Sequence, residues 1–138
     1  SAAGLGNESI NAIEASDEVL VVTNPNLPAV TDALKTVNIA EEAGTDILGV
    51  VVNRATGHES ELDRDEIESM LGYEVIMEVP EHEKVQEALA VKKPMVHHEP
   101  DHHVSERFKA VAAEVAGLEY EPDLEEDGLI TRIVNKLR

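Results

Sequence analysis

Three shortages narrow the protein classes to which this 138-residue chain can belong. It has no cysteine, which excludes disulfide bonds, thiolate metal ligands and a cysteine nucleophile. It has no apolar run long enough to span a membrane and no recognisable signal peptide. Basic residues are few: 11 Lys and Arg stand against 29 Asp and Glu, a net charge of −18 that disfavours nucleic acid as a partner. We therefore expect one cytoplasmic domain with a substantial core.

The excess of acid is compatible with a folded protein, because the expected strands are strongly apolar and the carboxylates fall on helix faces and loops. Two explanations of this charge stay open. One is a host with high intracellular salt, as in a halophilic archaeon, where ions screen such a surface. The other is an acidic surface that binds a basic partner protein.

Short, β-branched and nearly continuous apolar runs are typical of strands buried on both faces. Three such runs occur, at 19–23, 47–53 and 75–79. Between them lie helical patterns at 28–43 and after Asp63, a residue type suited to an N-cap, and these patterns end at Gly44 and Gly72. The alternation predicts an α/β fold, a parallel sheet with flanking helices.

Helical patterns also begin near Glu8 and cover residues 81–91 and 104–116. We expect an α/β domain over 1–118, an acidic linker over 119–128 and a terminal helix over 129–138. Three parallel strands are few, and the first would leave an apolar edge uncovered, which favours an incomplete sheet with missing neighbours.

The chain opens on small residues, Ser1–Gly6, which lead directly into the first helical pattern. Such a turn lets the backbone approach an anion at a helix N-terminus. An ordinary glycine-containing loop explains these residues equally well.

Polar or loop-forming residues stand at the end of each expected strand. In parallel α/β sheets, ligands bind beyond the carboxyl ends of the strands. The amide of Asn53 can pair with the edge of a nucleobase, while Arg54 offers a stacking plane or a charge. Because strand ends are commonly polar, no single one of these residues identifies a site. The residues concerned are Thr23, Asn24, Pro25, Asn53, Arg54, Pro80 and Glu81.

Five ordered blocks carry a resemblance to a known family: SAAGLG, TNPNLPAVTDALK, GVVVNRA, VPEHEKVQEAL and KKPMV. Together they resemble the carboxyl-terminal part of the MinD/ParA group of deviant Walker ATPases, and most of all its MinD-like members. The resemblance implies an incomplete P-loop NTPase-like fold, because the lysine-bearing P-loop and the Walker-B aspartate of the family have no counterpart in this sequence. We therefore assign no catalytic residue and expect no ATP hydrolysis by this chain alone.

The resemblance also implies roles for individual residues. Gly4 corresponds to the switch that senses the γ-phosphate, and Thr23, Asn24 and Pro25 to a segment that lines the site and the dimer face. Asn53 corresponds to the adenine-contacting asparagine, Arg54 to its neighbour, and Pro80 with Glu81 to the loop that closes over the base. The implied cofactors are ATP or ADP with Mg²⁺, bound by the complete protein.

The implied function is placement of the cell-division site, or another spatial positioning, through ATP-dependent homodimerisation, membrane binding and an unidentified partner protein. A ParA-type partitioning ATPase is disfavoured by the acidic surface, and an iron–sulfur carrier by the lack of cysteine. A truncated relative that acts as a non-catalytic protein- or membrane-binding module is the other interpretation.

The last ten residues reverse the charge of the chain, since they contain three basic residues and no acidic one. At helical spacing, one face is apolar and the opposite face basic, a pattern typical of a helix that lies in an anionic membrane surface. A helix that packs against protein is the alternative. The apolar residues are Leu129, Ile130, Ile133, Val134 and Leu137, and the basic ones are Arg132, Lys136 and Arg138.

Residues 97–103 contain four histidines, whose imidazoles suit zinc or nickel. Adjacent histidines rarely point at one ion, and Asp101 is placed to cap the following helix. We therefore predict a solvated loop and assign no metal site there, and no role to His58 or His82.

Overall fold

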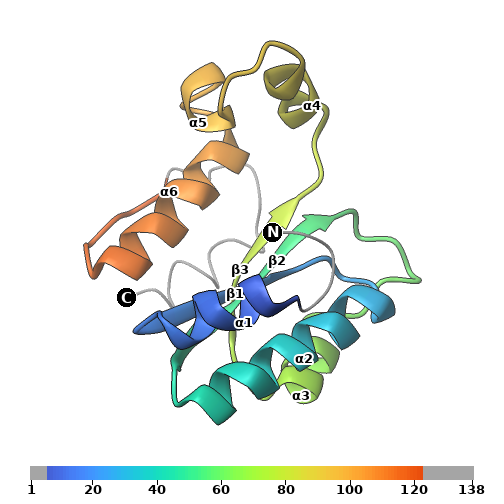
Figure 1. The fold of residues 1–138 in the computed structure, drawn as a ribbon. Helices are drawn as coiled ribbons and strands as arrows, with labels where there is room; N and C mark the ends of the chain where they lie inside the picture. Colours follow the sequence, from blue (N-terminus) through green and yellow to red (C-terminus); the bar gives the residue numbers. More distant parts are fainter. Residues whose placement is uncertain (1–5, 123–138) are drawn as a thin grey trace. The chain divides into compact units, whose positions relative to one another are not determined.

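The computed structural model describes residues 6–122, which form three strands joined by helices (Figure 1). They divide into two compact units, one up to Val75 and one from Ile76 onward. The elements are α1 (Asn7–Glu14), β1 (Glu18–Thr23), α2 (Leu27–Ala43), β2 (Asp46–Ala55), α3 (Arg64–Leu71), β3 (Val75–Pro80), α4 (Glu83–Ala90), α5 (Met95–His98) and α6 (His103–Ala116).

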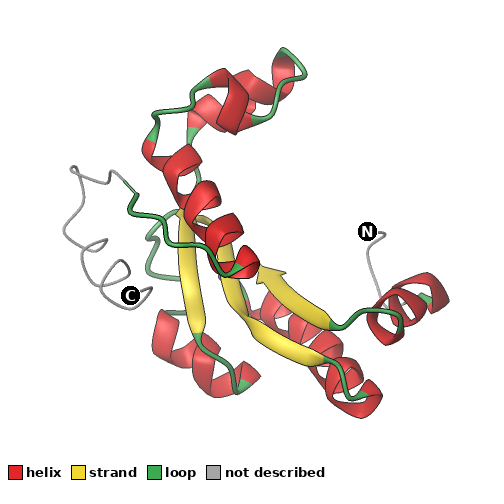
Figure 2. Cartoon of the chain, turned by 90° about the vertical axis from the view of Figure 1, so that its left-hand side faces the viewer, coloured by secondary structure: helices red, strands yellow, loops and turns green. Residues whose placement is uncertain are grey.

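The strands lie side by side in the order β1-β2-β3 and form a parallel sheet (Figure 2). This arrangement confirms the predicted α/β class. β2 extends to Ala55, so Asn53 and Arg54 are among the last residues of the strand and do not belong to the loop after it. The pairing sets Thr23, the last residue of β1, opposite Val52, so β1 ends beside the last few residues of β2.

A bulge interrupts the pairing of β1 with β2. Val19 lies opposite Ile47, but the next residue, Leu20, lies opposite Gly49, so Leu48 is an extra residue in β2. Gly49 has a φ of 149°, a conformation that glycine adopts far more easily than other residues. Ile47 and Val50 both pack against the core although strict alternation would turn them to opposite faces, and the extra residue accounts for this.

Helix α2 is the crossover between β1 and β2, and it packs on both strands (Figure 1). The side chain of Asn26 caps its start by accepting the N–H of Ala29 at 2.9 Å, and Gly44 ends it at a φ of 73°. The buried face of α2 meets valines of the sheet and the apolar side of α3. This core consists of Val21, Val30, Ala33, Val37, Val50, Val52, Ile67, Leu71 and Val75.

The prediction that every strand is buried on both faces is wrong for β1. Val22 is 58 % exposed, whereas Val21 and Thr23 are buried. Successive side chains of a strand point to opposite faces, and only the face that carries Val21 belongs to the core beneath α2.

Helix α3 begins after the predicted N-cap, Asp63, which forms a capping box with Glu66. The Asp63 carboxylate accepts the N–H of Glu66 at 2.8 Å, and the Glu66 side chain accepts the N–H of Asp63 at 2.8 Å. Glu68 on the same helix accepts the N–H of Val75 at 2.9 Å and pairs with Arg64, whose guanidinium also donates to the Val75 carbonyl. These bonds attach α3 to the start of β3.

In the second unit, α4, α5 and α6 contact one another in sequence order, and the buried Ser105 joins α6 to α5. Its hydroxyl lies 3.1 Å from the carbonyl of Met95 and 2.6 Å from that of Glu99. The prediction of a solvated loop over 97–103 is wrong at its start, because α5 includes His97 and His98.

Helix α6 is capped by His102 and not, as predicted, by Asp101. Its Nδ1 accepts the N–H of Val104 at 3.2 Å. The cap residue must stand directly before the first helical residue, and α6 starts at His103, one position earlier than the sequence predicts, so that His102 is the cap.

Two predicted segments fall wholly or mainly outside the described residues, namely the linker over 119–128 and the helix over 129–138. Within residues 6–122, no helix combines the length and the apolar character that crossing a membrane requires.

Replacing Asp63 with Ala is expected to lower the free energy of unfolding by about 1 kcal/mol, because the N–H of Glu66 loses its acceptor. Chemical denaturation followed by circular dichroism measures this change. Asp65→Ala removes an acidic residue of the same first turn that has no capping bond, and Asp63→Asn keeps a capping oxygen. An equal loss in Asp65→Ala and Asp63→Ala contradicts the capping box.

Candidate functional site

The end of β1 brings the first predicted segment, Thr23 to Pro25, against the sheet. Thr23 is 5 % exposed, and its hydroxyl donates to the carbonyl oxygen of Asn24 at 3.0 Å. Pro25 is also buried, while Asn24 is half-buried. The Asn24 amide is therefore the group of this segment best placed to meet a ligand.

The end of β2 has an unusual backbone. Arg54 adopts a φ of 57°, which few residues other than glycine adopt. The side-chain oxygen of Asn53 accepts the N–H of Arg54 at 3.0 Å and so supports this conformation. The amide nitrogen of Asn53 takes no part in this bond, and the side chain of Arg54 is exposed.

A third part of this edge, the loop from Thr56 to Leu62, was not predicted as functional. The carboxylate of Glu61 accepts the N–H of Thr56 at 3.0 Å, the Thr56 hydroxyl at 2.6 Å and the N–H of His58 at 2.8 Å. The N–H of Leu62 donates to the carbonyl of Pro25 at 2.8 Å, which attaches the loop to the end of β1. No motif in the sequence marks Glu61 for this role.

Hydrogen bonding sets the titration of Glu61. The Thr56 hydroxyl is the largest cause that lowers the pKa of this carboxyl, against a smaller opposing effect of burial, and the N–H groups of His58 and Thr56 also lower it. Each of these donors favours the ionised form. The loop is therefore held in its observed conformation by a carboxylate.

The structure thus brings together five of the predicted residues: Thr23, Asn24, Pro25, Asn53 and Arg54. Pro80 is the last residue of β3 and Glu81 follows it, in the second unit. Gly4 lies outside the described residues, as do the predicted membrane-contacting residues Leu129, Ile130, Arg132, Ile133, Val134, Lys136, Leu137 and Arg138.

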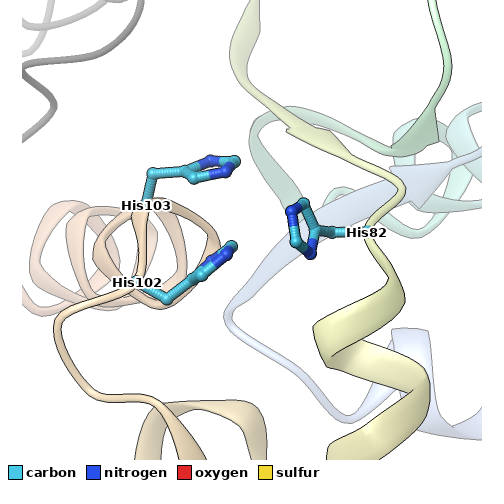
Figure 3. Close-up of side chains that lie close together, drawn as sticks. All are labelled: His82, His102 and His103. Atoms are coloured by element: carbon cyan, nitrogen blue, oxygen red, sulfur yellow. The ribbon is translucent and has the colours of Figure 1, made fainter.

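The second unit holds a group that the sequence analysis missed. His82, to which no role was assigned, lies beside His102 and His103, and a nitrogen of each ring lies within 4.8 Å of the other two (Figure 3). The ring centroids are 4.4 Å apart for His82 and His102 and 4.3 Å apart for His102 and His103. All three residues are half-buried.

Each ring of this histidine cluster is held by a bond to its Nδ1. That of His82 accepts the N–H of Lys84 at 3.1 Å, and that of His103 lies 2.6 Å from Nη1 of Arg107. Burial is the main cause that lowers the pKa of His102, and the charge of His82 lowers it further. The cluster therefore favours the neutral imidazole at His102.

Comparison with known proteins finds one matching domain family and a similar ATP-binding protein. The model of the AAA domain family matches residues 9–88. An ATP-binding protein of Methanocaldococcus jannaschii is 36 % identical over 137 residues, which are 98 % of this chain and 52 % of that protein.

Two solved structures share the fold. The cell-division ATPase MinD of Pyrococcus furiosus has a TM-score of 0.75 and 27 % identity, over 85 % of this chain and 49 % of that one. The septum site-determining protein MinD of Pyrococcus horikoshii, complexed with Mg-ADP, has a TM-score of 0.73 and 24 % identity, over 83 % and 49 %. The chain spans about half the length of the relatives that it matches.

Glu61→Gln is expected to speed amide hydrogen exchange at Thr56 and His58 about threefold to tenfold at pH 7, because charged acceptors bind more strongly than neutral ones. In the unchanged chain, protection is present above the ordinary pKa of 4.5 and is lost as pH falls through the lower pKa of the folded state. NMR exchange rates, corrected for intrinsic pH dependence, measure both effects. Glu59→Gln is the control, and an equal effect there argues against the role of Glu61.

Proposed function

The chain belongs to the AAA domain family, and we propose from this membership that it is the carboxyl-terminal portion of a MinD-like ATPase. In that ATPase it lines the base side of an ATP site, takes part in ATP-dependent dimerisation and attaches the protein to a membrane. The process served is placement of the cell-division site or a related spatial positioning. The likeness to the P. furiosus cell-division ATPase supports this proposal.

One observation carries the nucleotide assignment, namely the shared edge formed by the ends of β1 and β2. Since Thr23 lies opposite Val52, Asn24 and Asn53 follow at adjacent strand ends. Amide groups of this kind match the donors and acceptors on the edge of a purine. The shape of the loop is fixed in advance by Glu61 and by the positive φ of Arg54.

These groups suit one part of a nucleotide and not another. Asn24, Asn53 and Arg54 offer amide and guanidinium groups, which fit a base or a ribose. The sequence contains no glycine-rich loop with a lysine for the triphosphate. We therefore assign the base side to this edge, with Pro80 and Glu81 closing over the base. Gly4 is assigned to the γ-phosphate, and the other ligands of the phosphates and of Mg²⁺ are left to residues beyond this chain.

Membrane attachment is proposed from the last ten residues of the sequence. At helical spacing, five apolar side chains fall on one face of this segment and three basic side chains on the opposite face. One such segment binds an anionic surface weakly, whereas a dimer presents two copies and binds far more tightly through the raised effective concentration. Dimerisation driven by ATP thereby controls attachment.

Asn53→Ala is expected to weaken ATP binding by the MinD-like ATPase about tenfold, through loss of a hydrogen bond to the base. Isothermal titration calorimetry with ATP measures the change. Because Asn53 also supports the backbone of Arg54, Asn53→Asp provides a second variant that keeps the acceptor oxygen and removes the amide donor.

The matched control for this experiment is Asn38→Ala, which removes an exposed asparagine from α2. The assignment predicts unchanged affinity for the control and weakened affinity for both Asn53 variants. Unchanged affinity in both Asn53 variants removes Asn53 from the site.

Ile133→Glu is expected to abolish co-sedimentation of the ATP-bound MinD-like ATPase with phosphatidylserine vesicles, because it places a charge on the apolar face of the terminal segment. Thr131→Glu adds the same charge on the polar face and should weaken binding only in part. Equal losses in the two variants indicate a purely electrostatic attachment and reject insertion of the apolar face.

A further inference from the structure

We propose that His82, His102 and His103 form a binding site for a divalent transition-metal ion such as Zn²⁺, Co²⁺ or Ni²⁺. A nitrogen of each ring lies within 4.8 Å of the other two (Figure 3). Three ligand atoms this close need to move only slightly to surround one ion at the usual metal–nitrogen distance of about 2 Å. All three residues belong to the second unit.

The choice of metal follows from the donor set. Imidazole nitrogen suits borderline ions of the zinc type, whereas Mg²⁺ and Ca²⁺ prefer oxygen. Three protein ligands leave a fourth tetrahedral position for water or another small ligand, which is the pattern of an open rather than a closed site. The half-burial of the rings shields the ion from bulk water and still leaves a route of entry.

The rings converge because the starts of two helices bring them together. His82 is the N-cap of α4, and its Nδ1 accepts the N–H of Lys84. His102 is the N-cap of α6, and His103 is the first residue of that helix. Since folding already fixes the three rings, little conformational entropy remains to be lost when an ion binds.

Three hydrogen bonds to the rings and two nearby positive charges weaken the binding of the ion. The N–H groups of Lys84 and Val104 and the guanidinium of Arg107 donate to the Nδ1 atoms of the three rings. A neutral imidazole has one free lone pair, so coordination must displace such a bond in each ring, and a bond of N-cap strength is worth about fivefold in affinity. The cations of Lys84 and Arg107 repel the ion, while Glu99 attracts it. We therefore expect reversible binding, weaker than at a structural zinc site.

Titration of the full chain with Zn²⁺ by calorimetry and with Co²⁺ by visible absorption tests the site. The expected result is one ion per chain, with the absorption bands of a low-symmetry Co²⁺ complex. Absence of any one-to-one binding in the unchanged chain overturns the proposal without reference to variants.

The variants His82→Asn and His102→Asn remove one imidazole each while keeping a good capping side chain, so the helices should stay intact. Each is expected to lower Zn²⁺ affinity at least about tenfold and to change the Co²⁺ spectrum. His97→Asn is the matched control, because His97 is exposed and lies outside the cluster. His103→Gln gives the same test without altering a cap.

Circular dichroism confirms that each variant is folded. If the Zn²⁺ affinity of His82→Asn and of His102→Asn equals that of the unchanged chain, any bound ion is held by other residues and the proposal is overturned. Loss of binding in His97→Asn does the same, because it moves the site to the exposed histidine run.

Discussion

Two parallel strands cannot be joined by a tight turn, so the chain that leaves β1 must return along the sheet before it can form β2. Helix α2 makes this return, and the burial of Val30 and Val37 against the strands holds it in place. The same constraint sends both strands in one direction and puts their carboxyl ends at one edge. Every residue of the candidate nucleotide-binding edge depends on that arrangement.

Features with a local cause could be predicted from the sequence. Asp63 and Gly72 mark the ends of α3, and Gly44 ends α2, because caps depend on residues within one turn. The parallel sheet followed from apolar runs and their alternation with helices. Asn24 and Asn53 were placed at one edge by the same reasoning, since strand direction determines which ends meet.

Features that depend on tertiary contact could not be predicted. His82 and His102 are twenty positions apart, and nothing in either local sequence indicates that the starts of α4 and α6 meet. Glu61 stands in a polar loop like many glutamates, and its three donors become apparent only in the folded loop. Asp101 is a residue type that commonly caps helices, but α6 begins at His103, so the cap position falls on His102.

The extra residue of β2 is accommodated without changing the side of the sheet that the rest of the strand faces. In a regular strand, one inserted residue would turn every later side chain to the opposite side, but a bulge sets two residues against one and absorbs the insertion. Ile47 before Leu48 and Val50 after it therefore both reach the interior, and Asn53 lies on the side that a strand without Leu48 would also give it. Loss of Leu48 would restore a regular strand and leave the asparagine amide in place, so a lineage can delete this residue without altering ligand recognition at the contact residues.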